Sequence, residues 1–430
     1  MDLESLDNMV LYDSDSDSDD DLEIITIAAM EAQRLEAESS SSRRSSTQPR
    51  NFIRRDHLGG HRRLFLDYFN DPPVFPPKIF RRRFRMNRSL FLRIVSEVVA
   101  HEPYFVQKRN SAGVLGLSSL VKITAAIRLL AYGIAADAID EYLRIGESTA
   151  LKCLRKFAKA IIAIFSDEYL RSPNNNDIAR LLAIGESRGF PGMLGSIDCM
   201  HWTWKNCPTA WKGMYTGHAH EPTIILEAVA SSDLWIWHAF FGLPGSNNDI
   251  NVLERSSVFS ELAQGRAPPI NYTVNGNDYT MGYYLADGIY PQWATFVKTI
   301  PCPQGNKKKY FAKAQEANRK DVERAFGVLQ ARFAIVRGPA RSWSLKTIKD
   351  IMKACIILHN MIVEDERDEC VVQDMDYEQS DKVPPIEVLQ EQLPDVMEFI
   401  QRHRRIRDRG AHSQLKADLI EHLWQLHNES

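Results

Sequence analysis

Short apolar runs separated by turn-forming residues between positions 193 and 300 predict five β-strands. The first run, 193–197, ends at Asp198. The second and third, 223–230 and 234–241, are parted by a turn-like Ser-Ser-Asp and predict a meander. A helical stretch over 251–263 follows, then a run at 283–286 that ends at Asp287 and a fifth strand over 294–300. Both aspartates are therefore expected at the carboxyl ends of buried strands.

The next pattern along the chain is helical. Val322, Phe326 and Leu329 recur at three- and four-residue spacing, so an amphipathic helix is predicted, with Glu323 about one residue round from its apolar stripe. Three strands, a helix, two strands and a helix form the order of a ribonuclease-H-like nuclease core. The predicted fold class is therefore α/β with a mixed sheet, covering residues 186–365.

Residues 87–185 are rich in helical patterns and predict a separate helical domain. Helices are expected over 89–100 and 118–132. Residues 136–143, a turn at 144–147 and a helix capped by Ser148 that runs to about Phe165 predict a helix-turn-helix. Its second helix would turn Ala150, Leu151, Leu154, Phe157 and Ile161 inward and present the basic side chains Lys152, Arg155, Lys156 and Lys159 for DNA contact. A solvated basic helix is the alternative.

The net charge of −3 over 430 residues conceals two oppositely charged segments. Residues 1–41 hold thirteen acidic residues and one Arg, so residues 1–50 are expected to form a disordered acidic, Ser-rich tail. Residues 43–93 hold fourteen Lys or Arg and three Asp. Within them, residues 51–86 predict a basic arm for phosphate contact or nuclear import, with a cluster at Arg81, Arg82 and Arg83. Residues 366–430 predict a polar linker followed by C-terminal helices.

Asp198, Asp287 and Glu323 are the strongest candidates for chemistry. Taken singly, a strand-end Asp is usually a turn or cap residue and a helical Glu is usually solvated. Their order within a nuclease-like core instead predicts an acidic triad. Such a triad can hold a pair of Mg²⁺ or Mn²⁺ ions, which activate a water and stabilise the departing oxygen of a phosphodiester.

Four segments also resemble a known family. They are GSIDCMHWTWKNCPTAWKGMYTG, EPTIILEAVASSDLWIWHAFFGLPGSNNDINVL, YYLADGIYPQWATFVKTI and ERAFGVLQARFAIVRGPARSW, within residues 80–365. They resemble transposases of the PIF/Harbinger superfamily, closest to its Pong-like plant branch. The resemblance implies a DDE transposase whose catalytic residues fall on Asp198, Asp287 and Glu323. It further implies terminal inverted repeats as the DNA substrate, a short AT-rich target and a Myb-like DNA-binding partner of the same element.

Other residues near the predicted triad are candidates for supporting roles. Asp249 opens a helix and is either a cap residue or an auxiliary to the metal site. His201 and Arg324 are candidates for second-sphere contacts to the metal or the phosphate. Trp202, Trp204 and Trp211 either stack on unpaired bases or pack into the core. The remaining phosphate-contact candidates are Lys205, Lys212, Lys307, Lys308 and Lys309.

The remaining expectations concern location and assembly. No apolar stretch approaches the roughly 20 residues that span a bilayer, and no secretory signal precedes the acidic start, so we expect an intracellular, nuclear protein and no membrane. Leu415, Leu419, Leu423 and Leu426 form a stripe that is either a nuclear export signal or a helix docked on the core. Transposition joins two DNA ends, so at least a dimer is expected. A domesticated, non-transposing chromatin or protein-interaction factor is the alternative function.

Overall fold

The computed structural model describes residues 53–111, 113–218, 220–267, 270–374 and 396–429. The chain divides into two compact units, Met1–Arg54 and Arg55–Ser430, and everything below concerns the second. The acidic segment 1–41 and most of the linker after residue 374 lie outside the described residues, so the structure does not address the predicted disorder there. None of the described helices combines the length and apolar character that a membrane crossing needs.

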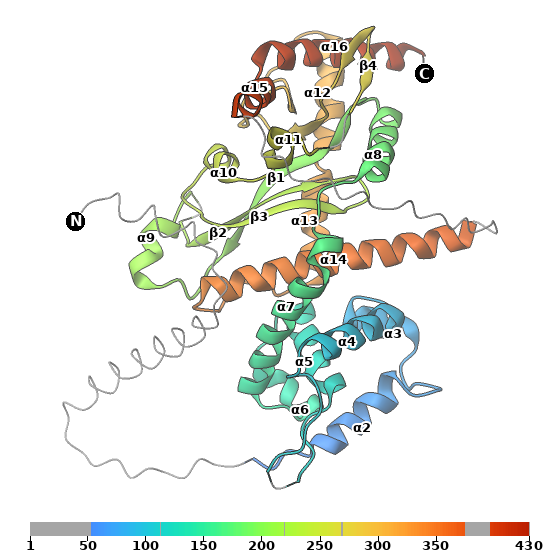
Figure 1. Ribbon diagram of the computed structural model, residues 1–430, viewed down its shortest axis with the longest axis vertical. Coiled ribbons are helices and arrows are strands. Elements are labelled where there is room, and N and C mark those ends of the chain that lie inside the picture. Colours follow the sequence, from blue (N-terminus) through green and yellow to red (C-terminus); the bar gives the residue numbers. More distant parts are fainter. Residues whose placement is uncertain (1–52, 112, 219, 268–269, 375–395, 430) are drawn as a thin grey trace. The chain divides into compact units, whose positions relative to one another are not determined.

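A five-stranded mixed sheet organises the second half of this unit (Figure 1). The strand order is β3-β2-β1-β6-β7. The first three strands form an antiparallel meander, whereas β6 and β7 run parallel to β1. This is a mixed α/β fold, as the pattern of runs predicted. The strands span Met193–Thr203 (β1), Thr223–Ala230 (β2), Ile236–Pro244 (β3), Tyr283–Ala286 (β6) and Phe296–Lys298 (β7).

A bulge at the start of β1 sets the register of the strand that carries Asp198. The pairing of β1 with β6 shifts between Met193 and Gly195. Gly195 has a φ of 152°, and a Cβ at this position would lie 2.6 Å from the carbonyl oxygen of Ala230. Glycine is therefore required here, because any side chain would meet the backbone of β2. From Ser196 onward β1 pairs regularly with β2 as far as Thr203.

Between residues 53 and 192, where the structure describes all but one residue, eight helical segments precede the sheet and belong to the same compact unit. Residues with known capping preferences stand at several helix ends. Asn174 and Asp177 form a reciprocal capping box at the start of α8. Gly133, with a φ of 60°, ends α5 in the left-handed conformation that glycine tolerates. The segments span His57–Tyr68 (α2), Pro77–Phe84 (α3), Arg88–His101 (α4), Ser119–Tyr132 (α5), Ala136–Ile139 (η3, a 3₁₀-helix), Asp140–Leu143 (α6), Glu147–Tyr169 (α7) and Asn175–Ser187 (α8).

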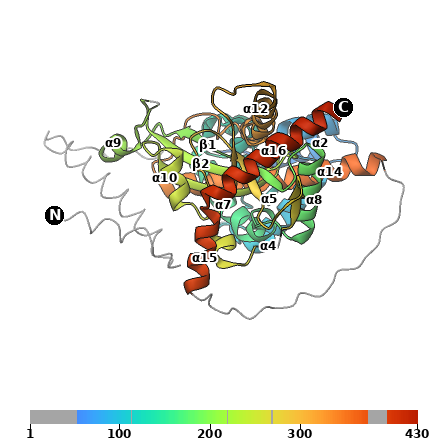
Figure 2. The same cartoon turned by 90° about the horizontal axis from the view of Figure 1, so that it is seen from above.

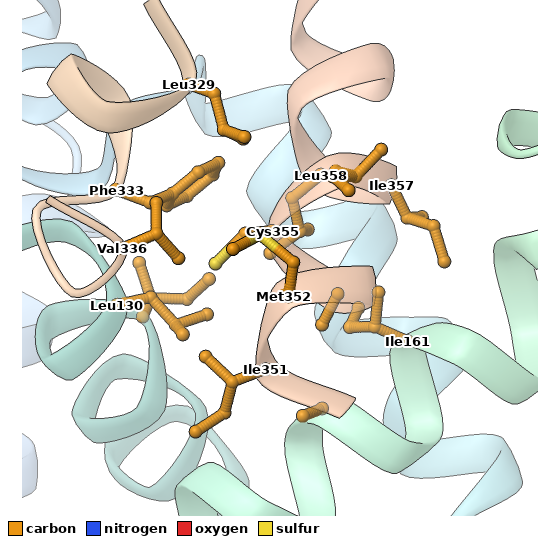
Figure 3. Close-up of a cluster of buried hydrophobic side chains, with 14 of the residues drawn as sticks. Leu130, Ile161, Leu329, Phe333, Val336, Ile351, Met352, Cys355, Ile357 and Leu358 are labelled. Atoms are coloured by element: carbon orange, nitrogen blue, oxygen red, sulfur yellow. The ribbon is translucent and has the colours of Figure 1, made fainter. Parts of the chain in front are cut away.

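A large apolar core joins the helical region to one face of the sheet. The long helix α14 (Leu345–Asp374) packs against α7 and also contacts β3 and α13 (Asp321–Arg332). Figure 3 shows Ile161 of α7 facing Met352 of α14, with Leu130 of α5 and Phe333 close by. Full burial of each such side chain contributes about 1.5–3 kcal/mol, so this cluster fixes α7 as a central packing element.

The predicted helix-turn-helix segment contains the expected helical pieces, although its first helix is short. A 3₁₀ turn leads directly into the four-residue α6, and three residues separate α6 from α7. One inward-facing assignment was wrong, because Leu151 is 41% exposed. The periodicity of α7 instead buries Cys153 beside Leu154. Of the basic side chains, Lys152, Arg155 and Lys159 are exposed and Lys156 forms an ion pair with Glu102 at 3.3 Å.

The helix expected over 251–263 is broken into two. α10 (Asp249–Arg255) and α11 (Ser260–Gln264) are separated by four residues. A β-hairpin that the sequence reasoning missed, β4 (Tyr272–Val274) with β5 (Asn277–Tyr279), lies between them and β6. The remaining elements are η4 (Thr209–Trp211), α9 (Lys212–Tyr215), α12 (Asn306–Arg319), α15 (Val396–Ile406) and α16 (Arg409–Glu429).

The C-terminal helix α16 is part of the core. Leu415, Leu419 and Leu423 are at most 5% exposed, while Leu426 is 39% exposed. They pack in a cluster that includes Leu285 of β6 and residues of α12, and Figures 1 and 2 show α16 beside α12. Of the two interpretations of the leucine stripe, the structure supports the docked helix, because three of its four leucines are covered.

Candidate active site

The register of the sheet places Asp198 and Asp287 side by side. Ser196 of β1 pairs with Leu285 of β6 in parallel, and the two aspartates each stand two residues further along. Because side chains alternate faces along a strand, both aspartates continue the same face at the same level. The parallel pairing of β1 with β6 has ended here, which opens the edge of the sheet at this point. Two carboxylates 89 positions apart in sequence are thereby brought together.

The expected position of Asp198 within its strand was wrong, and that of Asp287 is confirmed. Asp287 directly follows β6. Asp198 instead lies within β1, which continues to Thr203 because β2 keeps pairing with it. Backbone N–H groups hold both carboxylates. Cys199 donates to Asp198 Oδ1 at 2.8 Å, and Ile289 donates to Asp287 Oδ1 at 2.9 Å. Each carboxylate is thus oriented by the backbone beside it.

Buried polar contacts fix the end of α12 against this edge. The fully buried Gln315 donates to the carbonyl oxygens of Ala286 and Val297, at 3.0 and 3.1 Å, and so ties α12 to β6 and β7. The hydroxyl of Ser196 donates to the carbonyl oxygen of Asn318 at 3.1 Å. These bonds place the last residue of α12, Arg319, next to the aspartates.

Arg319 links the aspartate pair to the predicted glutamate. Its Nη1 lies 3.3 Å from Asp198 Oδ2 and 2.9 Å from Glu323 Oε1, and its Nη2 bonds Glu316 at 2.8 Å. The arginine side chain is only 11% exposed. One guanidinium nitrogen therefore contacts two members of the predicted triad, which brings Glu323 to the aspartates.

Sequence reasoning missed Arg319 and chose Arg324 as the arginine of the site. Arg324 is 57% exposed and pairs with Asp321 at 2.6 Å, an acid outside the triad. The available signal was spacing, since Arg319 and Glu323 are four residues apart in a helical pattern. That signal names a pair but does not tell which arginine faces the sheet.

Asp249 is a fourth carboxylate in the same electrostatic environment. It opens α10 after Asn248, whose side chain caps that helix. Burial raises its pKa, and the charge of Asp287 raises it further. Burial also raises the pKa of Asp198, to about 6; Cys199 N–H and Arg319 oppose the shift, and Asp287 and Asp249 add to it. We call Asp198, Asp249, Asp287 and Glu323 the carboxylate cluster.

His201 lies two residues beyond Cys199 on β1, at the rim of the carboxylate cluster. Its Nδ1 is 2.9 Å from the hydroxyl oxygen of Thr223. Desolvation lowers its pKa, and the charge of Asp249 opposes that shift. Asp249 and His201 are therefore electrostatic neighbours, and their supporting role stays a prediction.

A buried glutamate of β2, on the opposite face of the sheet from Asp198, was also missed by sequence reasoning. Glu227 of β2 pairs across the strands with Cys199 and is fully buried. Its Oε1 lies 3.4 Å from Nε2 of His238, and Cys199 Sγ lies 3.6 Å from the hydroxyl of Tyr290. The available signal was a single Glu inside the otherwise apolar run TIILEAVA. A charged side chain is rarely buried in a strand unless it has a partner.

The donor set of the carboxylate cluster fits a hard divalent cation. All of its side-chain donors are carboxylate oxygens, the ligands that Mg²⁺ and Mn²⁺ prefer. Burial is the main reason that the pKa of Asp198 is raised, and the charges of Asp287 and Asp249 add to it, so a bound cation would stabilise the charged carboxylate. Within the described residues, no three His, Cys, Asp or Glu side chains already converge as a metal site. Arg319 stands between Asp198 and Glu323.

The predicted DNA-contact residues fall in several places. Arg81 pairs with Glu366 at 2.7 Å, Arg82 is exposed, and the guanidinium of Arg83 lies 4.2 Å from the ring centre of Phe75. The lysine run begins α12, where Lys307 pairs with Glu421 and its two neighbours are exposed. Lys205 and Lys212 are exposed at the far end of β1.

Of the three tryptophans that the sequence left open, two belong to the core. Trp202 and Trp204 are 3% and 0% exposed, and their indole N–H groups donate to the carbonyl oxygens of Gly338 and Ser342. Base stacking by these two rings is therefore excluded. Trp211 is 43% exposed and remains available at the surface.

Comparison with known families matches the part of the chain that contains this site. Residues 167–370, which contain β1 to β7 and the whole carboxylate cluster, match the family model of a plant transposon protein. Residues 60–99 match a domain of unknown function. This match and the relatives described below support the PIF/Harbinger superfamily for this chain. This confirms the superfamily that the four sequence segments indicated.

Two relatives show how distant the members of this superfamily are. The human protein named "Putative nuclease HARBI1" is 22% identical over 254 residues, which are 58% of this chain and 68% of the relative. The Arabidopsis thaliana "Protein ALP1-like" is 23% identical over 306 residues, 67% of this chain and 72% of the relative. No solved structure matches the chain.

Proposed function

We propose that this chain is a divalent-metal-dependent DNA endonuclease of the DDE type that acts in cut-and-paste transposition. We infer a ribonuclease-H-like core from the strand order β3-β2-β1-β6-β7, in which an antiparallel meander is followed by two parallel strands. The observation that carries it is the parallel register that sets Asp198 beside Asp287. Superfamily membership and the name "Putative nuclease" of one relative support it.

Asp198, Asp287 and Glu323 would hold the metal, with two ions expected. A bound Mg²⁺ or Mn²⁺ supplies activation of the attacking water or 3′-hydroxyl and stabilisation of charge on the departing oxygen. The protein orients its ligands through the backbone N–H groups of Cys199 and Ile289. Asp249 and His201 lie close enough to influence the charge of the cluster. Arg319, anchored by Glu316, would exchange a carboxylate for a DNA phosphate.

The test is cleavage of a labelled duplex that carries the terminal inverted repeat of the source element, in Mg²⁺ or Mn²⁺. Wild-type protein should cut it, and Asp198→Asn, which keeps the shape of the side chain, should not. Circular dichroism of both proteins checks that the substitution retains the fold. A folded wild-type protein that never cuts, with the partner protein also added, or a Glu323→Gln variant that still nicks, contradicts the proposal.

A second candidate is a domesticated nuclear protein that binds chromatin or other proteins without transposition. The observation in its favour is the position of Arg319, because a guanidinium that contacts both Asp198 and Glu323 satisfies these acids within the protein itself. Inverted repeats beside the gene favour the transposase. A gene without them, encoding a folded protein that does not cut, favours the domesticated factor.

Location and partners belong to the proposal as well. We propose nuclear action, with the terminal repeats and a short AT-rich target as DNA partners. A Myb-like protein of the same element would deliver the chain to the repeats, and the active form would be at least a dimer because two DNA ends must meet. Sedimentation of the protein with and without repeat DNA tests the assembly.

A further inference from the structure

Two loops beyond the end of β1 expose large apolar side chains. Trp343 is 67% exposed, Met214 is 51% exposed and Trp211 is 43% exposed. One face of the Trp211 ring is supported by Tyr215, with ring centres 6.3 Å apart and planes at 24°. A tryptophan held on a loop and open to solvent is costly to leave without a partner, so a cluster of such side chains indicates a binding surface.

Backbone contacts make these loops one surface. The indole N–H of Trp204 donates to the carbonyl oxygen of Ser342 at 2.8 Å, and the backbone N–H of Lys205 donates to that of Ala340 at 2.9 Å. The amide of Asn206 donates to the carbonyl oxygen of Arg341 at 2.6 Å. The loop that carries Trp343 is therefore fastened to the segment that carries Lys205, and α9 with Lys212 follows directly. Figures 1 and 2 both place α9 beyond this end of the sheet.

The charge of this surface is of one sign. Residues 204–218 contain two Lys and no acidic residue, and residues 334–349 contain four Lys or Arg and no acidic residue. Lys205, Lys212 and Arg341 are exposed. Exposed aromatic rings next to exposed cations suit a nucleic acid strand, because bases stack on the rings and phosphates pair with the cations. Protein interfaces are also enriched in aromatic residues, Met and Arg but depleted in Lys, so the exposed lysines of one charge sign favour a nucleic acid here.

We propose that this surface binds unpaired bases and backbone of the DNA next to the cleavage site. The loop platform consists of Lys205, Trp211, Lys212, Met214, Arg341 and Trp343. This inference rests on the proposed function, because only a nuclease site at the carboxylate cluster puts the bound DNA next to a cut. Trp204 follows Asp198 by six residues along an extended strand, so the loop platform lies about 20 Å from the carboxylate cluster. At 3.4 Å per nucleotide, that distance corresponds to about six nucleotides.

The proposal gives a function to the part of β1 that follows Asp198, which is to support the loop platform. A strand that ended at Asp198 would leave the loops without support, whereas the five further residues carry the chain to Thr203. DNA that enters the carboxylate cluster would continue along β1 to the platform. Strand separation near the cut would expose the bases that Trp343 and Trp211 receive, so the platform would favour single-stranded or frayed flanks over a closed duplex.

The test measures DNA binding apart from cleavage. Asp198→Asn protein, without divalent metal, is titrated against labelled oligothymidine and against a duplex of equal length, with fluorescence anisotropy as the readout. Trp343→Ala in this background should weaken oligothymidine binding roughly tenfold, while Trp343→Phe, which keeps an aromatic face, should restore most of it. Lys212→Ala should lower the slope of log affinity against log salt by about one.

Phe65→Ala is the matched control, because Phe65 is 42% exposed on α2, outside the loop platform. It should leave oligothymidine binding unchanged. Equal affinity for DNA of Trp343→Ala, Trp211→Ala and the Asp198→Asn parent would overturn the proposal and point to a protein as the occupant. Binding that depends on Trp343 in a chain that never cuts would uphold the platform and sink only the nuclease. A chain that cuts but ignores both tryptophan changes would sink only the platform.

Discussion

The middle of β1 and the loops beyond its end carry opposite charges and are built in different ways. In the middle, Asp198 depends on sheet register, on a backbone N–H and on an arginine shared with Glu323. Beyond the end, Lys205 and Trp343 stand on exposed loops that backbone hydrogen bonds hold together. Substitutions in the carboxylate cluster should therefore be strongly coupled, whereas those on the loop platform should add nearly independently.

Groups of like charge need different structural support when they are buried than when they are exposed. Burial raises the pKa of Asp198 and of Asp249, and the neighbouring carboxylates raise both further, so rigid elements and a counter-charge must hold these acids together. Basic groups on exposed loops are screened by solvent and need no such support. Four experiments break or sharpen this contrast, in order of decreasing effect.

The largest effect is expected from Asp287→Asn. It should reduce metal-dependent cleavage by about a thousandfold or more, a loss of roughly 4 kcal/mol of transition-state stabilisation, because the amide removes one anionic ligand. Asp249→Asn, a neighbour outside the triad, should lose only about tenfold. Single-turnover cleavage at saturating Mg²⁺ measures both. Equal losses would place Asp249 among the metal ligands and revise the triad.

The second effect concerns the support of the carboxylate cluster by the C-terminal helix. Leu419 is fully buried against the core that includes Leu285 of β6, so Leu419→Ala should lower the free energy of unfolding by about 2–5 kcal/mol. Leu426→Ala is the control, since that leucine is 39% exposed and should cost far less. Urea unfolding of both variants gives the difference. Wild-type stability combined with increased nuclear accumulation of Leu419→Ala would instead restore the export signal.

Arg319→Ala should change metal affinity in the direction opposite to the loss of a ligand. The arginine would compete with a bound cation for Asp198 and Glu323. Removing its charge-assisted hydrogen bond, worth about 1.5–3 kcal/mol, should therefore let Mn²⁺ bind about ten- to a hundredfold more tightly. Isothermal titration calorimetry measures this without any reaction. Arg324→Ala, whose arginine pairs with Asp321, should leave the affinity unchanged. Weaker binding to Arg319→Ala would show that the arginine organises the site rather than competing for it.

The smallest effect is the pH dependence of stability in the metal-free protein. Burial first, and then neighbouring carboxylates, raise the pKa of Asp198 from 3.8 to about 6. A raised folded-state pKa means that the stability linked to this group is fully present below pH 3.8 and is lost as pH rises through about 6. Between pH 5 and 7 wild type should therefore lose about 1 kcal/mol relative to Asp198→Asn. Parallel stability curves over this range would contradict the shift.

The sequence predicted the strands better than it predicted the helices around them. The runs 223–230 and 283–286 coincide with β2 and β6, because a buried strand can be recognised in the sequence as a continuous run of apolar residues. The prediction of one helix over 251–263 was wrong, because hydrophobic periodicity does not reveal a break between two short helices. Leu151 was misplaced for a related reason, since one residue of rotation decides between a buried and an exposed position on a helix.

The sequence by itself determined the order of elements, the identity of three acidic residues and the positive charge of the loops beyond β1. These features are local: each is carried by the residue types and spacing of a short segment. Only the tertiary structure decided that Asp198 lies beside Asp287, that Arg319 rather than Arg324 joins them to Glu323, and that α16 is buried. It also separated the buried Trp204 from the exposed Trp343. Such outcomes depend on strand register and on packing between distant segments, which spacing along the chain does not encode.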